Sequence, residues 1–225
     1  MPDQREAILD AALIHVAFDG WSEATLRKAA GDADVPLSDA RAAFPRGAVD
    51  LALAYHRRGD DRMAERLAEL EQDGLRMRER IARAIRIRIG VIEDKEAVRR
   101  GTTLFALPQH SADGARAVWG TADRIWTALG DTSQDMNWYT KRATLSGVYG
   151  STVLYWLGDD SHEQQDTWGF VDRRIGDVMR IEKAKAAVQS NPVARAALAG
   201  PSWLMSRVRA PRVRTRSDMP GSWRR

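Results

Sequence analysis

Apolar residues recur at helical spacing along nearly the whole chain, and this periodicity limits the possible folds more than any other feature. Ile8, Ala12 and Val16 lie four residues apart, and a later stripe runs from Ile81 to Ile92 with arginines on the other faces. Such spacing places apolar side chains on one face of an α-helix. No segment of the sequence alternates with the two-residue period of a half-buried strand. We therefore expect an all-α protein, with helices near 4–18, 23–31, 37–44, 47–73, 81–92, 95–106, 112–129, 135–157 and 163–186.

Helix-breaking and capping residues divide the N-terminal part of the chain. Gly20 can end the first helix, Ser22 can cap the second, and Pro36 and Pro45 bracket a short third one. In the long fourth helix, the residues expected on the inner face are Leu51, Tyr55, Met63, Leu67 and Leu70. We expect three parts, namely 1–60, a helical body over 61–186, and a tail over 187–225.

Charge is distributed unevenly over the 225 residues. The chain carries a net charge of +4, but the segment from Arg195 onward holds eight arginines and one acidic residue, a net charge of +7. The remainder holds 27 basic and 30 acidic residues, a net charge of −3, so the body lacks the basic surface of a nucleic-acid-binding protein. The chain has no cysteine, which excludes disulfides and thiolate ligands. We also expect no membrane span and no secretory signal.

The basic tail also contains a short apolar cluster. The cluster comprises Trp203, Leu204, Met205 and Val208 and lies beside Arg207 and Arg209. Burial of the apolar groups, with the arginines near anionic headgroups, is typical of a helix that lies on a membrane surface. The alternatives are a solvated chain end and a helix that packs on the body. The sequence therefore predicts an amphipathic C-terminal extension that binds an anionic membrane.

No pattern of residues predicts catalysis. The four histidines lie far apart and form no HExxH or ExxH motif, and the chain has no GxSxG motif and no glycine-rich phosphate loop after a strand. The acidic pairs Asp60-Asp61 and Asp159-Asp160 are adjacent, and adjacent helical positions point about 100° apart. The segment 159–161 is expected instead to end one helix and cap the next. We expect no catalytic residue, no metal site and no cofactor.

Aromatic residues are concentrated between Gly130 and Asp160. Trp138 and Tyr139 are adjacent at the predicted start of a helix, so both rings cannot point into one core face. At least one ring is expected to be partly exposed, as in a protein-binding hot spot. The alternative is that Trp138 packs its helix against a neighbour.

This stretch resembles the signature of the Coq-nine family, GDxSxDxNWYxxRxxLxxxY followed by a D-D/S segment and a TW. The matching residues are Gly130-Asp131, Ser133, Asp135, Asn137-Trp138-Tyr139, Arg142, Leu145, Tyr149, Asp159-Asp160-Ser161 and Thr167-Trp168. Members of that family are lipid-binding accessory proteins of ubiquinone biosynthesis with a fold like that of TetR regulators. The resemblance implies a TetR-like helical bundle.

The first sixty residues also resemble the DNA-binding end of TetR-type regulators. The matches are packing and turn positions: Ala29-Ala30-Gly31, Val35, Phe44-Pro45 and Asp50-Leu51. The DNA-contacting positions differ and hold Leu37, Ser38, Asp39, Arg41 and Ala43. Asp39 would face phosphates of like charge, and apolar side chains offer no donors to base edges. The sequence thus predicts a degenerate helix-turn-helix that binds no specific DNA.

The family resemblance further implies a function and its sites. A lipid pocket would be formed by Ile85, Ile89, Phe105, Val148, Thr152 and Trp156, although such apolar stripes also suit a filled core. A patch for the di-iron hydroxylase of ubiquinone biosynthesis would comprise Ile125, Asp135, Trp138, Tyr139 and Arg142. The implied protein is a non-catalytic homodimer that binds an isoprenoid quinone or another lipid. It would be cytoplasmic and peripheral on the inner membrane in a bacterium, or on the matrix side in a mitochondrion. The alternative is a TetR-type repressor that senses a hydrophobic ligand.

Overall fold

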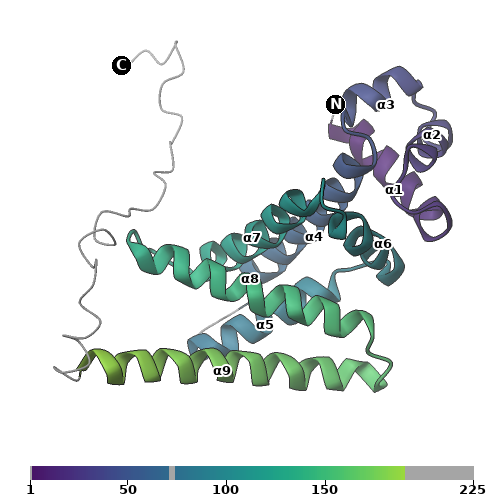
Figure 1. Ribbon diagram of the computed structural model, residues 1–225. Helices are drawn as coiled ribbons and strands as arrows, with labels where there is room; N and C mark the ends of the chain where they lie inside the picture. The colour runs from purple at the N-terminus through teal and green to yellow at the C-terminus, as the bar shows by residue number, and fades with distance from the viewer. Residues whose placement is uncertain (1, 71–73, 191–225) are drawn as a thin grey trace, which may run out of the picture.

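Helices make up nearly all of the computed structural model, which describes residues 2–70 and 74–190 (Figure 1). The described residues contain no strand, which confirms the all-α prediction. Most helices begin and end within a few residues of their predicted bounds. The elements are α1 (Pro2–Asp19), α2 (Glu23–Asp32), α3 (Leu37–Ala43), α4 (Ala48–Ala68), α5 (Met77–Gly90), α6 (Lys95–Ala106), α7 (Ser111–Ala128), α8 (Met136–Leu157), the 3-10 turn η1 (His162–Gln164) and α9 (Gln165–Ser190).

Helices α1 to α3 and the start of α4 form a small unit at one end of the molecule (Figure 1). Gly20 ends α1 with a φ of 64°, a value that glycine adopts without strain. Ser22 caps α2 as predicted, because its side chain accepts a hydrogen bond of 3.1 Å from the backbone N–H of Thr25. Leu26 and Phe44 are buried at the centre of this unit together with the apolar face of α1. The N-terminal helices thus share a hydrophobic core of their own.

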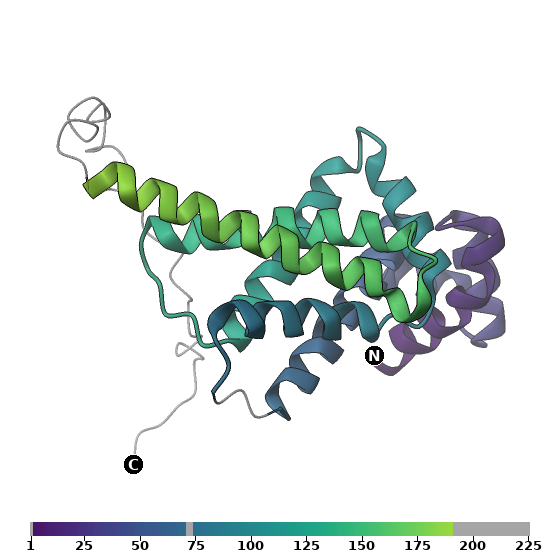
Figure 2. The same ribbon diagram turned by 90° about the horizontal axis from the view of Figure 1, so that it is seen from below.

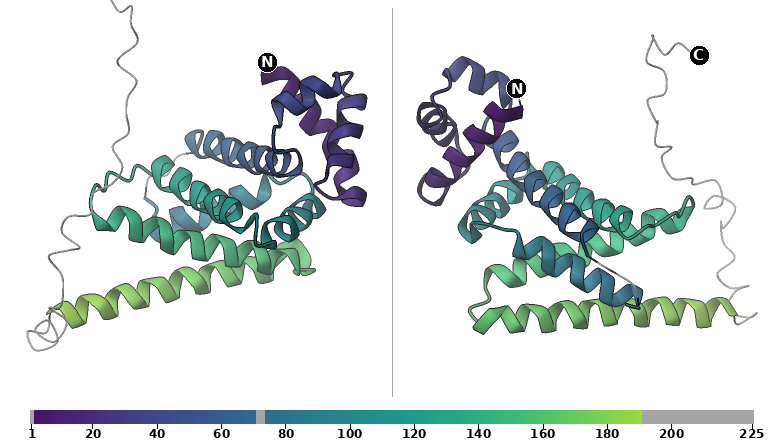
Figure 3. Two further views of the ribbon diagram at one scale, coloured as in Figure 1. Left: turned by 45° about the horizontal axis from the view of Figure 1, so that its top comes forward. Right: turned by 180° about the vertical axis from the view of Figure 1, so that it is seen from behind.

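Helix α4 runs out of this unit into the second core (Figure 3). Leu51 belongs to the first core, while Met63 and Leu67 belong to the second. The predicted boundary near residue 60 therefore lies inside one continuous helix. Leu70, predicted to point inward, lies beyond the end of α4 and is exposed.

The second core is formed by the end of α4 with α5, α7, α8 and α9. Helix α9 lies along α8, and α5 packs against both α4 and α9 (Figure 2). Val171 and Ile175 turn the inner face of α9 into this core. The helix continues to Ser190, four residues beyond its predicted end. The predicted membrane-binding residues 203–209 lie outside the described residues.

Helix α6 connects the two units. The indole nitrogen of Trp21 donates a buried hydrogen bond of 2.9 Å to the carbonyl oxygen of Ala97. Arg100 donates from the same helix to the carbonyl oxygen of Ala17 at 2.9 Å. These bonds connect the end of α1 and the segment after it to α6. Helix α6 is thereby held in place where it forms one wall of a cavity.

The corner between α8 and α9 depends on one carboxylate. Asp159 accepts hydrogen bonds from the backbone N–H groups of Ser161 at 2.8 Å and Thr167 at 2.9 Å. Hydrogen bonds from the hydroxyl groups of Ser161 and Thr167, together with these backbone bonds, outweigh burial and hold the pKa of Asp159 well below its usual range. The prediction that 159–161 ends one helix and caps the next is confirmed, and Asp159 provides the cap. Among the described residues, no helix is long and apolar enough to span a bilayer.

Candidate functional site

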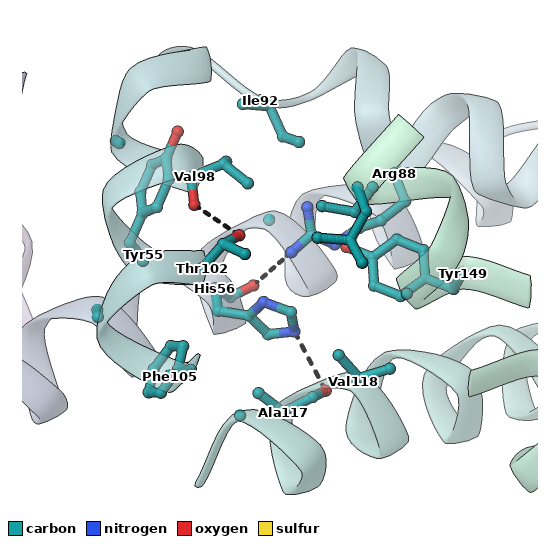
Figure 4. Close-up of a pocket in the computed structure, with 18 of the residues that line it drawn as sticks. Tyr55, His56, Arg88, Ile92, Val98, Thr102, Phe105, Ala117, Val118 and Tyr149 are labelled. Atoms are coloured by element: carbon teal, nitrogen blue, oxygen red, sulfur yellow. Dashed lines mark hydrogen bonds between the residues drawn. The ribbon is translucent and has the colours of Figure 1, made fainter. Parts of the chain in front are cut away.

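A cavity of about 420 Å³ lies between α4, α5, α6, α7 and α8 (Figure 4). Its volume falls within the range of small-molecule sites, about 300–1,000 Å³. Most of its wall is apolar and includes Val91, Ile92, Val98, Phe105, Val118, Val153 and Leu154. Leu154 is 61% exposed and also lines the cavity, so the cavity opens to solvent beside α8. An apolar cavity with an open side suits a ligand with a hydrophobic tail.

A charged pair lies at the polar side of the cavity. The guanidinium of Arg88 on α5 donates from Nε to a carboxylate oxygen of Asp60 on α4 at 2.6 Å. Thr121 on α7 donates to the same oxygen at 2.9 Å. Both charged side chains are less than 10% exposed. The carboxylate therefore balances the charge of Arg88 where water has little access.

His56 lies beside this pair and is held as a neutral donor. Its Nε2 is 3.1 Å from the carbonyl oxygen of Ala117 (Figure 4). The same nitrogen is 2.8 Å from the hydroxyl of Thr121. A carbonyl oxygen only accepts, so Nε2 carries the proton. Burial lowers the pKa of His56 to about 4; Asp60 opposes this shift and Arg88 adds to it. The imidazole is therefore uncharged near pH 7.

Two tyrosines complete the polar part of the wall. Burial raises the pKa of Tyr149 on α8, and the Arg88 guanidinium lies 5.8 Å from the centre of its ring. The hydroxyl of Tyr55 donates to the carbonyl oxygen of Asp94 at 3.3 Å and accepts from the N–H of Asp94 at 3.2 Å. Both phenols are protonated at neutral pH, so neither adds charge to the cavity.

Only one of the six predicted lipid-binding residues lines this cavity. Phe105 does so, whereas Ile85, Ile89, Val148 and Trp156 belong to the second core, and Thr152 is buried on α8. The cavity is lined instead by their neighbours Arg88, Tyr149 and Val153. Adjacent helical residues point about 100° apart. A residue that faces the core can therefore have a direct neighbour in the sequence that faces the cavity. The residues that line this cavity therefore differ from the predicted lipid-binding set, which stays a prediction.

The predicted partner patch is also rearranged. Ile125 is fully buried in the second core and is not part of the surface. Arg142 is buried too, and it pairs with Asp123 at 2.5 Å and with Asp131 at 2.9 Å. Asp135 caps α8 by accepting from the N–H of Asn137 at 2.9 Å. Three of the five predicted residues therefore hold the fold at this corner.

The two remaining residues of the patch, Trp138 and Tyr139, are half-buried, as the sequence predicted for at least one of them. Trp138 contacts Tyr139 edge-on, with ring centres 4.8 Å apart, and lies 6.0 Å from Trp119 of α7. The Arg142 guanidinium lies 4.0 Å from the Trp138 ring centre. We call Trp119, Trp138 and Tyr139 the aromatic cluster. It presents rigid apolar area next to a buried cation, as protein-binding hot spots do.

The polar residues of the cavity were missed in the sequence, although two signals pointed to them. Arg88 lies within the apolar stripe between Ile85 and Ile89, where a surface arginine does not belong. Gly59 lies inside the long helix α4, where glycine costs about 1 kcal/mol relative to alanine. No group of three metal-ligating side chains occurs among the described residues.

The fold and the cavity define a class, that of TetR-like helical proteins with a ligand-sized cavity behind a helix-turn-helix unit. A TetR transcriptional regulator from Nitrosomonas europaea matches the structure with a TM-score of 0.63. The match covers 77% of this chain and 97% of the regulator at 24% identity, a likeness that shows the fold alone.

Within this class, residues 111–182 match the COQ9 family model. The ubiquinone biosynthesis protein COQ9, mitochondrial, of Rattus norvegicus is 31% identical over 81% of this chain and 61% of its own length. The human protein of the same name is 29% identical over 81% of this chain and 60% of its own length. These matches confirm the resemblance to the Coq-nine family, so the chain is a relative of the COQ9 proteins. It spans about three fifths of the length of these curated relatives.

Proposed function

We propose that this protein binds a polyprenylated quinone intermediate in its cavity and presents it to the di-iron hydroxylase of ubiquinone biosynthesis at the membrane surface. It would catalyse no step itself. The observation that carries this proposal is the apolar cavity of about 420 Å³ in a relative of ubiquinone biosynthesis proteins. Each methylene group transferred from water into such a wall contributes about 0.8 kcal/mol to binding.

The size and opening of the cavity support a tailed ligand. A volume of about 420 Å³ lies toward the lower end of the range of small-molecule sites, about 300–1,000 Å³. That space accommodates a ring with a short part of an isoprenoid chain, while a longer chain would leave through the open side. The exposed Leu154 at this opening provides apolar surface for the emerging chain. The cavity therefore fits a head group and the first part of a tail.

Contact with the hydroxylase would involve the aromatic cluster. Trp138 and Tyr139 lie in the first turn of α8, and Tyr149 and Leu154 of the same helix line the cavity. A partner bound at the start of α8 would lie within a few helical turns of the ligand. We also propose a homodimer that is peripheral on the inner membrane, cytoplasmic in a bacterium or on the matrix side in a mitochondrion. Its basic tail would contact anionic lipid.

The alternative function is that of a TetR-type repressor that senses a hydrophobic ligand. The fold favours it, but the surface of α3 does not. Asp39 is exposed on α3, and Arg41 is paired with Glu23 of α2 at 2.6 Å. The short third helix therefore offers little free positive charge to a phosphate backbone.

Lipid extraction of the purified protein tests the proposal. Mass spectrometry should detect a bound isoprenoid lipid, and the variant Gly150→Leu should carry less of it. Gly150 lines the cavity, and a Cβ there would lie 3.7 Å from Val118, so a leucine side chain would grow into the ligand space. The matched control is Gly147→Leu on the exposed side of α8, where a Cβ has no neighbour within 4 Å. A protein that carries no lipid, and whose Tm does not rise with added isoprenoid quinone, would disprove the carrier function.

A further inference from the structure

One edge of the Arg88 guanidinium has no partner. Nε donates to Asp60, and Nη2 donates to the carbonyl oxygen of His56 at 2.9 Å. No hydrogen bond from Nη1 to any group in the described parts of the chain is found, although the side chain is only 4% exposed. In Figure 4 the unbonded nitrogen lies on the side of the guanidinium that faces Ile92 and the cavity. A charged donor that faces a cavity and has no acceptor in the protein can donate a hydrogen bond to a ligand there.

Gly59 makes this position possible. A Cβ at residue 59 would lie 2.6 Å from Nη1 of Arg88 and 2.7 Å from its central carbon. The guanidinium therefore lies flat against the backbone of α4, in space that only glycine leaves open. Gly59 itself lines the cavity. The position of the Arg88 guanidinium at the cavity wall therefore depends on glycine at residue 59.

Arg58 adds a second free donor on the α4 wall. Its Nε is buried and has no partner among the described residues, and the residue lines the cavity. Its other guanidinium nitrogens pair with Glu6, Asp10 and Glu93. The positive charge of Arg58 is therefore already matched by carboxylates, and only an N–H group remains to be satisfied.

The charges around the cavity indicate the chemistry of the acceptor. Asp60 neutralises Arg88, and His56 is neutral. Arg58 and Arg62, the other two arginines of the wall, are matched by Glu6, Asp10 and Glu93. A carboxylate or phosphate placed against Nη1 would be an additional negative charge near Asp60, removed from water without a cation of its own. An uncharged carbonyl oxygen would accept the hydrogen bond with a much smaller desolvation cost.

We propose that the cavity recognises an uncharged carbonyl oxygen on the head of its ligand through Nη1 of Arg88, and that it discriminates against carboxylates. This inference rests on the proposed function, because it assumes that the cavity holds a lipid. It defines the ligand class as neutral lipids with a ketone-type oxygen next to the apolar tail. Fatty acids and isoprenoid acids of similar length are excluded.

Three probes of matched chain length test the recognition in the wild-type protein at pH 7. The ketone geranylacetone, its hydrocarbon analogue without the oxygen, and the isoprenoid carboxylate of the same length would compete with a fluorescent lipid. The ketone should bind roughly tenfold more tightly than the hydrocarbon, as expected for one hydrogen bond to a charged group, and the carboxylate should bind less tightly than the ketone. Equal binding of ketone and hydrocarbon, or tightest binding of the carboxylate, would overturn the inference. If none of the three binds, the proposed function itself fails.

A glycine substitution isolates the donor. Gly59→Ala adds a methyl group that must displace the end of Arg88 while it leaves every charge in place. The preference for the ketone should fall to within about twofold of parity, while the affinity for the hydrocarbon changes little. Gly120→Ala is the matched control, because a Cβ there has no neighbour within 4 Å, and it should keep the wild-type preference. Full ketone preference in Gly59→Ala would show that Arg88 is not the donor to the ketone. If this variant does not fold, the ranking of the three probes in the wild-type protein tests the recognition of the carbonyl oxygen.

Discussion

The guanidinium of Arg142 donates from Nη1 to a carboxylate oxygen of Asp131 at 2.9 Å, and both side chains are only 3% exposed. Lys141 and Ser133 donate to the other oxygen at 2.7 Å and 2.8 Å. Burial by itself raises the pKa of Asp131, but these hydrogen bonds outweigh burial and hold the pKa well below the usual range of an aspartate. Much of the family signature around residues 130–142 therefore holds the corner between α7 and α8.

Asp131→Asn should lower the free energy of unfolding by about 3 kcal/mol, because it removes one partner of a buried ion pair. Denaturant unfolding followed by circular dichroism measures the change. Asp135→Asn is the matched control. Asparagine caps a helix as well as aspartate does, so this exposed position should lose almost nothing. Equal stabilities of the two variants would show that the Asp131 pair contributes no net stability.

His56 should make the protein less stable in mild acid. Its pKa is about 4 in the fold and about 6.5 in an unfolded chain, so between these values the unfolded state binds a proton that the folded state does not. Stability should therefore rise with pH from about 4 to 6.5 and then level off, by at most about 3 kcal/mol. His56→Gln keeps a donor and should flatten this slope in a series of thermal melts. The control His162→Gln, at an exposed position, should leave the slope of stability against pH unchanged. An unchanged slope in His56→Gln would show that His56 does not cause the loss of stability in acid.

The aromatic cluster should provide binding energy to the hydroxylase. Trp138→Ala or Tyr139→Ala should weaken association by about 2 kcal/mol or more, measured by calorimetry with the purified partner. Tyr155→Ala is the control, because Tyr155 is also on α8 and stacks on Phe170 with ring centres 4.5 Å apart. Wild-type affinity in both cluster variants would remove the cluster from the interface. Loss of helical content in them would mean that the rings serve packing alone.

Sequence-specific DNA binding should be absent. Asp39 exposes a negative charge on α3, which repels the phosphates of DNA. Arg41 is paired with Glu23, so its positive charge is already balanced. Gel-shift assays with fragments of the source genome should show no complex that persists at physiological salt. A complex that persists at that salt and withstands excess competitor DNA would instead support the repressor function.

The basic tail should bind anionic membranes. A chain that ends at Ser190 keeps every described helix and lacks the arginines of the +7 segment. It should remain folded but no longer sediment with vesicles that contain anionic lipid, because each arginine near such a surface contributes about 1 kcal/mol. Salt should weaken binding of the full chain without abolishing it, since screening spares the apolar contribution of Trp203 and Leu204. Equal sedimentation of both proteins would contradict this prediction.

Local features were sufficient to predict the helices, and those ends that a breaking or capping residue marks. Gly20, Ser22 and Pro45 act on the backbone within a few residues of themselves, so their effects are visible in the sequence. The partial exposure of the Trp138-Tyr139 pair followed from helical geometry in the same way.

The site was decided by contacts between distant segments. Arg88 and Asp60 are 28 residues apart, and their pairing against Gly59 depends on how α5 packs across α4. An apolar stripe such as Ile85 and Ile89 looks the same in sequence whether it faces a filled core or a cavity. Helical periodicity therefore determined which side chains turn inward. Which of these side chains fill the core and which line the cavity was decided only by the packing of neighbouring helices. The sequence does not contain this information in one place, because the cavity depends on the joint shape of five helices.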